Sequence, residues 1–254
     1  MPEEIRTPEP VAEMSMSDTI VGILSSPSEV YAAIATTEPK RSNWLIPLLL
    51  VIAAGIVFTL SVFTQPAIQD QMMEAQTKAM QKSVAEGRMT QEQMEQALEM
   101  NPAKPGSTMF LLFGSIGMVG AMVFTLFVYS GVYFLAGKLI LKSSVPYGKV
   151  LEVNGLSYYV GTIATLLTVV TVVAMGSIYA APSAALFVEN FDPMDKTHKF
   201  LSALNILEFW QLFVIAVGLA KIWQTTLAKG LAVVGGVWLV WTLVKVFANF
   251  GFGM

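Results

Sequence analysis

Two ionisable side chains lie inside apolar stretches near the C-terminus, and their types and spacing could do chemistry. Glu208 lies 13 residues before Lys221, and Lys245 lies 15 residues after Gly230. On helices these separations amount to about 20 Å and about 22 Å, so the two opposite charges have matching depth in a membrane. An unpaired charge there costs several kcal/mol, and we therefore predict that Glu208 and Lys245 pair. The alternative is that both side chains extend to the outer interface.

Further polar residues accompany this pair. Asn205 and Gln211 lie about one helical turn from Glu208 on either side and could complete a polar network. A ridge of threonines at three-residue intervals lies on an earlier apolar stretch: Thr162, Thr165, Thr168 and Thr171. Such threonines either line a polar path or, more commonly, bond back to carbonyls of their own helix.

Catalytic and metal-binding patterns are weak. The only histidine, His198, lies near Asp192 and Asp195, which could bind a divalent ion, but a solvated loop explains the same residues better. The chain has no cysteine and no nucleophile elbow, phosphate-binding glycine loop or zinc-helix motif. We therefore expect no enzyme activity, no catalytic, cofactor-binding or metal residues, and no binding of nucleic acid.

The elements that must position these residues are five long apolar stretches. They cover residues 44–63, 109–136, 159–181, 200–220 and 231–250. Each approaches or exceeds the roughly 20 residues that a helix needs to cross a bilayer. Hydrophobic residues make up 54% of the chain and charged residues 13%, which excludes an ordinary soluble globule. The sequence predicts an all-α polytopic membrane protein with five transmembrane helices in residues 44–254.

Two segments precede the first span: a polar tail and an amphipathic segment. Residues 1–17 are acidic and proline-rich, which predicts a disordered tail. Residues 18–43 are predicted to form a cytoplasmic interfacial amphipathic segment, in which Ser26 and Glu29 give a capping box around Pro27. Its apolar face is a predicted docking surface: Val30, Tyr31 and Ile34.

A helical insertion at residues 65–107 separates the first two spans. Gly87 divides it, and Thr90 with Gln93 gives a capping box for the second of two helices. We expect a helical hairpin that stands out from the membrane. Its methionines either dock a partner or pack the helices together, the candidates for docking being Met72, Met80 and Met94.

Orientation follows from lysine and arginine counts. The N-terminal region and the short second and fourth connections hold eight such residues, against six in the other loops. By the positive-inside rule we expect a cytoplasmic N-terminus and an extracytoplasmic helical hairpin. The first 16 residues lack the basic start and short apolar core of a signal peptide, so we expect the first span to be an uncleaved signal anchor.

Three blocks resemble the Yip (Ypt-interacting protein) domain in its bacterial inner-membrane form. They read ILSSPSEVYAAI, GKLILKSSVPYGKVLEVNGLSYYVGTI and ILEFWQLFVIAVGLAKIWQTTLAKGLAVVGGVWLVW. The resemblance implies five spans, a cytoplasmic N-terminus and no established enzyme activity. Some bacterial members work beside an ABC-type exporter with a periplasmic adaptor. The family has no agreed catalytic motif, so no site residue is carried over.

We therefore expect a non-enzymatic protein of the bacterial inner membrane that assembles with other membrane components. It would be an accessory subunit of an ABC-type export complex or a membrane-organising factor. Its partners would be the lipid bilayer, a permease, ATPase or periplasmic adaptor, or a second copy of itself. The alternative is an autonomous transporter or channel for ions or small solutes, although no inverted repeat or paired broken helices are evident.

Overall fold

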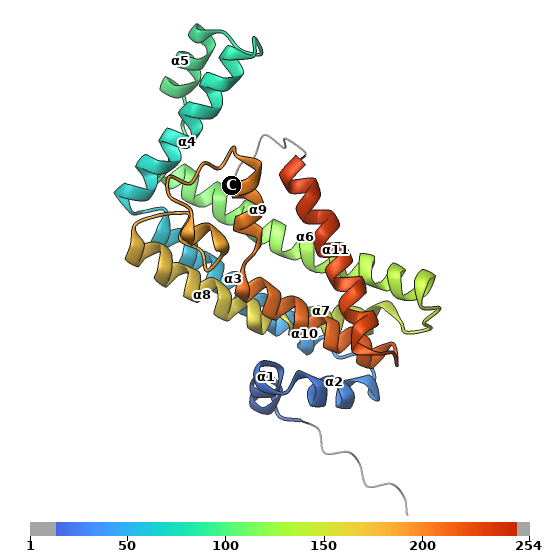
Figure 1. Cartoon of the computed structure of the whole chain (residues 1–254). Coiled ribbons are helices and arrows are strands. Elements are labelled where there is room, and N and C mark those ends of the chain that lie inside the picture. Colours follow the sequence, from blue (N-terminus) through green and yellow to red (C-terminus); the bar gives the residue numbers. More distant parts are fainter. Residues whose placement is uncertain (1–13, 248–254) are drawn as a thin grey trace, which may run out of the picture.

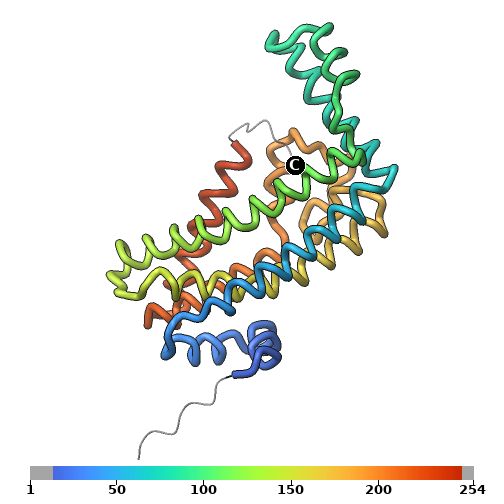
Figure 2. Tube along the Cα trace, turned by 180° about the vertical axis from the view of Figure 1, so that it is seen from behind, coloured from blue at the N-terminus to red at the C-terminus, as the bar shows by residue number. Residues whose placement is uncertain are grey.

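The computed structural model describes residues 14–247, which are helical apart from connecting loops and one isolated antiparallel bridge between Ser183 and Asn205. The helices follow the order α1 (Met16–Ser25), α2 (Pro27–Ala35), α3 (Ser42–Val62), α4 (Pro66–Ala85), α5 (Gln91–Glu99), α6 (Thr108–Ile140), α7 (Tyr147–Leu156), α8 (Tyr158–Met175), the 3-10 turn η1 (Ala184–Phe187), α9 (Lys196–Ala203), α10 (Ile206–Ile222) and α11 (Leu227–Phe247). Figure 1 and Figure 2 show a central bundle, with α1 and α2 at one end and α4 and α5 projecting from the other.

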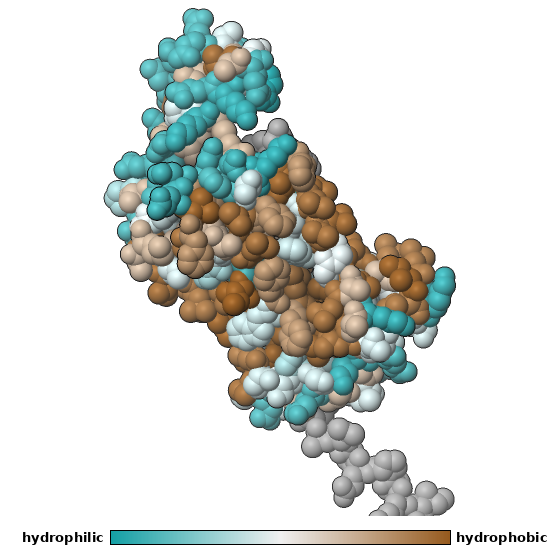
Figure 3. Space-filling view, in the orientation of Figure 1, coloured by the Kyte–Doolittle hydropathy of each residue, from teal (hydrophilic) through white to brown (hydrophobic). Residues whose placement is uncertain are grey.

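Within residues 14–247, four helices are long and apolar enough to cross a membrane. They are α3, α6, the continuous pair α7–α8 over Tyr147–Met175, and α11. Figure 3 shows the matching surface, a broad hydrophobic band between hydrophilic ends. Apolar side chains of α3 and α6 remain outward-facing, for example Leu49 at 56% and Phe124 at 66% exposure, which in lipid carries no hydrophobic penalty. The arrangement is that of an integral membrane protein.

The predicted fourth span is not one helix. Residues 200–220 fall on α9 and α10, which are separated by Leu204 and Asn205. Helix α10 has 17 residues, about 25 Å of rise, and is shorter than the four candidate spans. The count of five spans therefore remains a prediction.

The third predicted span ends early. Gly176 adopts a left-handed conformation (φ 59°) and caps α8, so the apolar residues after it form a loop instead of the end of a helix. The second predicted span, by contrast, is longer than expected. The side chain of Ser107 caps the first turn of α6, and the helix continues for 33 residues.

The N-terminal segment differs from expectation in two details. Residues 1–13 of the predicted tail lie outside the described residues, while Met16 and Ser17, also assigned to the tail, begin α1. Ser26 precedes α2 as predicted, but its side chain makes no capping hydrogen bond. The predicted capping box at this helix is therefore wrong.

The insertion contains both expected helices. Gly87 has a positive φ of 70° in the turn between α4 and α5. The Thr90 side chain accepts from the Gln93 backbone N–H, and the Gln93 side chain accepts from the Thr90 N–H, so the predicted capping box is confirmed. Figure 1 shows α4 and α5 side by side at the far end from α1 and α2. On which side of the membrane they lie remains a prediction.

The main core joins the N-terminal helices to the bundle. Its buried members come from α1, α2, α6, α7, α8, α10 and α11, among them Ile23, Tyr31, Val153 and Leu219. Tight packing here needs Gly218, because a Cβ on this residue would lie 2.5 Å from Val153 Cγ1 and 2.9 Å from the Tyr31 ring. Helices α1 and α2 are therefore part of the folded bundle.

Candidate functional site

Three of the four predicted intramembrane polar residues meet at one cavity. Asn205, Glu208 and Gln211 all line a cavity of about 270 Å³. The remaining lining comes from the neighbouring helices: Val51 of α3, Met122 of α6, Tyr158, Gly161, Ala164 and Thr165 of α8, and Leu207 of α10. On α6 the lining residue Met122 lies 14 residues from the first residue, Thr108. On α10 the lining residue Glu208 lies 14 residues from the last residue, Ile222. Each separation is about 21 Å of helix, which places the cavity near the middle of the membrane domain.

The break before α10 supplies part of this cavity. Asn205 Oδ1 accepts hydrogen bonds from the backbone N–H groups of Leu207 and Glu208, and so caps the new helix. The loop after α8 satisfies the rest of the interrupted backbone. Ala184 N–H donates to Leu204 O at 3.1 Å, and Ile206 N–H donates to Pro182 O at 3.2 Å. Non-helical backbone at membrane depth is tolerated because protein groups satisfy it.

Glu208 and Lys245 do not form the predicted ion pair. Glu208 Oε1 instead accepts a hydrogen bond from Trp238 Nε1 at 3.1 Å, and α11 thus contributes an indole in place of an ammonium group. Among residues 14–247 no ion pair joins the two, and the Lys245 side chain is exposed, although its charge acts on Glu208 at longer range. Lys245 lies seven residues beyond Trp238 on α11, about 10 Å of helix, so the two charges do not lie at one depth as predicted.

A buried ion pair that the sequence reasoning missed lies at the end of the bundle near α2. Lys149 Nζ lies 2.7 Å from Glu152 Oε2, and these side chains are 6% and 0% exposed. Lys149 also donates to Ile34 O at 2.7 Å, at the C-terminal end of α2. Glu152 Oε1 accepts from Asn43 Nδ2 at 2.6 Å and from Lys40 N–H at 3.2 Å, at the start of α3. One pair on α7 therefore holds the ends of two other helices, each with the charge sign that the helix dipole favours.

Tyr31 reinforces this junction. Its hydroxyl donates to Val153 O at 3.0 Å from a fully buried position. Burial and the nearby Glu152 charge raise the pKa of Tyr31 far above the ordinary value, so the phenol stays protonated. The signal in the sequence was the spacing of Lys149 and Glu152 on one helical face, which the sequence reasoning treated as part of a polar turn.

A hydrogen-bonded chain leads from α7 to the cavity. Asn154 Nδ2 donates to Ser130 Oγ at 3.0 Å and to Leu126 O at 3.1 Å, both on α6. Ser157 Oγ donates to Asn154 O at 2.7 Å and accepts from Gln211 Nε2 at 3.2 Å. Gln211 is thus fixed by α7–α8, not by Glu208.

The predicted docking face of α2 is not available to a partner. Val30, Tyr31 and Ile34 are 1%, 0% and 8% exposed, since they pack into the main core. An amphipathic face has the same pattern whether it covers a partner or its own bundle. This docking assignment is therefore wrong.

The methionines of the insertion have mixed surroundings. Met94 is 6% exposed between α4 and α5, and Met72 packs against the cluster of Val62, Ile68, Val172 and Ala180. Met80 is half-buried. These side chains mainly pack the insertion together and onto the bundle, and do not form an open methionine surface.

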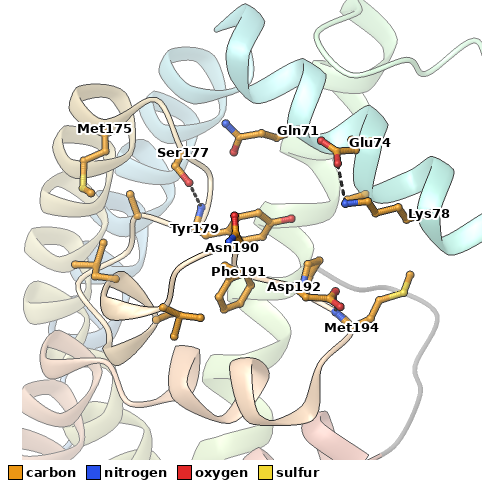
Figure 4. Close-up of a pocket in the computed structure, with 16 residues that line it drawn as sticks. Gln71, Glu74, Lys78, Met175, Ser177, Tyr179, Asn190, Phe191, Asp192 and Met194 are labelled. Atoms are coloured by element: carbon orange, nitrogen blue, oxygen red, sulfur yellow. Dashed lines mark hydrogen bonds and ion pairs between the residues drawn. The ribbon is translucent and has the colours of Figure 1, made fainter.

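A larger pocket lies at the base of α4. It has a volume of about 510 Å³ between α4 and the loop that follows α8 (Figure 4). Glu74 and Lys78 form an ion pair of 2.7 Å on one wall, and Tyr179 packs on Phe191 with ring centroids 4.6 Å apart. Asp192 adds a further carboxylate to the rim. Burial raises the pKa of the Tyr179 hydroxyl above its ordinary value.

Gln71 fixes the position of this pocket. Its side-chain amide donates to Gly176 O at 2.7 Å and accepts from Ile178 N–H at 3.1 Å. A side chain on α4 thus completes the backbone hydrogen bonding of the loop after α8. Neither Gln71 nor the loop was predicted as a site, because their sequence separation is more than 100 residues.

The remaining candidates have structural partners. His198 Nδ1 accepts from Asp192 N–H, and its ring stacks on Phe191 at 5.5 Å, so His198 joins the first turn of α9 to the loop before it. The threonine ridge bonds back along α8: Thr162, Thr165 and Thr168 donate to the carbonyls of Tyr158, Gly161 and Ala164. Only Thr165 of this ridge also reaches the central cavity.

Comparison with known proteins agrees with this architecture. A family model described as the Yip1 domain matches residues 21–248, nearly the whole helical part of the chain. No curated protein and no solved structure matches the chain. The matched range includes the second half of α1, all of α2, the buried Lys149–Glu152 pair and the central cavity. The chain therefore belongs to the Yip1 domain family of membrane proteins.

Proposed function

We propose that this Yip1 domain protein is a non-enzymatic subunit that assembles with other components of the bacterial inner membrane. Its role would be that of an accessory subunit of an ABC-type export complex, or of a membrane-organising factor. The observation that carries the proposal is a projecting unit, α4 with α5, that is firmly attached to the membrane domain and has a pocket at its base.

Firm attachment matters because a docking element must hold its partner in a fixed position relative to the membrane domain. Ile68 of α4 is fully buried against Val62 and Val172 of the bundle, and Gln71 is bonded to the loop after α8. The rest of the insertion presents a hydrophilic surface (Figure 3). Such a unit can hold a partner at a fixed distance from the bilayer, and needs no catalytic group.

The pocket chemistry suits a protein segment. Opposite charges on Glu74 and Lys78 stand beside the aromatic pair Tyr179 and Phe191, and Leu186 and Met194 add apolar lining. A peptide loop offers this mixture of groups in return. The unit lies at the opposite end from α1 and α2, so with a cytoplasmic N-terminus it would meet a periplasmic adaptor or the outer loops of a permease, in preference to a cytosolic ATPase.

The test is affinity purification of the tagged protein from its native membranes in mild detergent, followed by mass spectrometry. We expect stoichiometric recovery of a permease, adaptor or ATPase with the wild type. Reversal of two pocket charges, Glu74→Arg with Asp192→Arg, should abolish recovery, whereas Gln81→Arg, at an exposed position of α4 outside the pocket, should not. Recovery of the wild-type protein alone, or undiminished recovery with the pocket variant, would overturn the proposal.

One observation favours the alternative of autonomous transport. The α9–α10 interruption places a capped helix start and a carboxylate at mid-membrane depth, a feature of transporter binding sites. A second, matching broken helix is not present among residues 14–247. Docking therefore remains the leading proposal.

A further inference from the structure

The mid-membrane cavity has a single charged residue in its lining. Glu208 is the only ionisable carboxylate or ammonium group among the ten residues that line it. Oε1 accepts from Trp238, whereas Oε2 accepts no hydrogen bond from the residues that the structure describes. Glu208 occupies the third position of α10, where the helix dipole stabilises a negative charge. The cavity therefore offers one unsatisfied carboxylate oxygen in a region of low dielectric.

Apart from the Asn205 amide and Tyr158, the other lining groups are oxygen acceptors or apolar surface. Gln211 uses its Nε2 for Ser157, which leaves its Oε1 as an acceptor, and Thr165 uses its hydroxyl hydrogen for Gly161 O. The apolar part consists of Val51, Met122, Gly161, Ala164 and Leu207. Oxygen acceptors and the Asn205 amide gather around Glu208, while the five apolar residues of the wall make only van der Waals contact.

This division decides the class of ligand. A Ca²⁺ or Mg²⁺ ion takes six or more oxygen ligands, and half of the side chains in the lining cannot supply any. An anion would meet the carboxylate. An ammonium group satisfies both halves, because it donates to a few acceptors and carries a carbon body that fills the apolar part.

We propose that this cavity binds a small organic cation, an ammonium group on a short apolar body. The ammonium would donate to Glu208 Oε2 and to Gln211 Oε1, and the Tyr158 ring would add a cation–π contact. The volume of about 270 Å³ lies just below the range of ordinary ligand pockets, which restricts the ligand to small amines.

The helix break explains why such a site exists at this depth. A continuous fourth helix would place another turn of backbone where Asn205 begins α10. Because the loop after α8 satisfies Leu204 O and Ile206 N–H, the chain can end one helix and begin another beside the cavity without exposing polar backbone to lipid. Glu208 is thereby placed in the first turn of a helix, in place of mid-helix.

Trp238 gives a direct readout. Its indole N–H is bonded to the carboxylate that the ligand would contact, so binding should change its emission. Purified protein in detergent is titrated with n-butylammonium, with n-butanol of similar size, and with sodium ions, and both fluorescence and thermal unfolding are recorded. To isolate the signal, the same titration is run with Trp238→Phe.

We expect n-butylammonium to give a saturable change and to raise the unfolding temperature, with n-butanol and sodium at least tenfold weaker. Glu208→Gln, which keeps the shape and an acceptor for Trp238, should weaken amine binding at least tenfold. Glu189→Gln, in an exposed loop, should leave it unchanged. Ala164→Leu should remove binding by filling the cavity while the charge remains.

Equal responses to the amine and the alcohol, or amine binding that survives both Glu208→Gln and Ala164→Leu, would overturn the assignment. A sodium response equal to that of the amine would also overturn it, in favour of a metal-ion site. Failure of this proposal would not affect the docking proposal, because Glu208 and Ala164 do not line the pocket at the base of α4.

Discussion

Lys149 Nζ lies 2.7 Å from Glu152 Oε2, one turn apart on α7, and both side chains are almost fully removed from solvent. Each charged group also forms hydrogen bonds with other helices. The Lys149 ammonium donates to Ile34 O at the C-terminal end of α2. The Glu152 carboxylate accepts hydrogen bonds from Asn43 and from the Lys40 N–H at the start of α3. The pair thus joins three helices at the end of the bundle where the chain enters the membrane domain.

Removal of one member of this pair should destabilise the protein strongly. Lys149→Met leaves a buried carboxylate without its counter-charge, and Glu152→Leu leaves a buried ammonium. Each should cost about 3–5 kcal/mol, because breaking a buried pair strands a charge. Thermal unfolding in detergent, together with limited proteolysis of α1 and α2, measures the loss.

The double variant and an exposed pair serve as controls. Lys149→Met combined with Glu152→Leu should be less unstable than the sum of the single changes. Lys78→Met breaks the exposed pair with Glu74, whose side chains are 64% and 66% exposed, and should leave stability unchanged within error. Additive losses in the double variant would show that the two charges are not coupled.

The glycines of this protein should separate into sensitive and insensitive positions. A Cβ at Gly155 would lie 2.5 Å from Trp44 Cα, a contact with backbone that cannot move aside. We expect Gly155→Ala to cost about 1–3 kcal/mol through overpacking between α7 and α3. Gly117 of α6 has nothing within 4 Å of an added Cβ, so Gly117→Ala should be neutral or slightly stabilising. Unfolding temperatures compare the two, and equal effects would contradict the packing at α3.

Exchange of the charges at positions 208 and 245 should not restore stability. Because Glu208 is bonded to Trp238 and Lys245 is exposed, Glu208→Lys combined with Lys245→Glu should be at least as unstable as Glu208→Lys alone. Trp238→Phe should cost about 0.5–2 kcal/mol by removing the donor. A double-mutant cycle on unfolding free energies measures both effects. Recovery in the charge-exchanged variant would restore the ion pair that the sequence suggested.

Acidification should loosen α9. Asp195 caps this helix by accepting the His198 N–H at 2.9 Å, and this hydrogen bond lowers the pKa of the carboxyl below its usual value. A lowered folded-state pKa contributes stability above the unfolded value, about 3.9, and that contribution is lost as pH falls through the folded-state pKa. The protection of the α9 amides against hydrogen exchange, measured relative to their intrinsic exchange rates at each pH, should therefore fall below about pH 4. Asp195→Asn keeps a capping oxygen and should remove this pH dependence, whereas an unchanged dependence would assign it to another group.

Much of the fold was accessible from the sequence because long apolar runs and caps are local signals. The ranges of α3 and α6, the Thr90 capping box and the division at Gly87 depend on neighbouring residues only. The end of α8 at Gly176 was missed, since the apolar residues after it continue the hydropathy pattern of the helix. Hydropathy indicates that a residue is buried in protein or in lipid, but it does not indicate where a helix ends.

The candidate sites depended on tertiary pairing and were harder to foresee. The helical spacing of Asn205, Glu208 and Gln211 predicted that these residues lie together, and all three line one cavity. Which residue of α11 contacts Glu208, Trp238 or Lys245, depends on how α11 packs against α10. The face of α2 was recognised as apolar, yet periodicity alone could not say that α7 and α10 cover it. Lys149 and Glu152 looked like ordinary loop charges until their burial was known.

The interrupted fourth segment also bears on biogenesis. A translocon recognises a new span by the length and apolarity of a single helix, and α10 offers 17 residues preceded by a helix break at Leu204 and Asn205. Helix α11 packs tightly against α10: a Cβ at Gly230 would lie 2.5 Å from Ala216 O, so the two helices touch backbone to backbone. We expect α10 and α11 to enter the bilayer together as a pair, with the loop after α8 closing over the break only once both are in place.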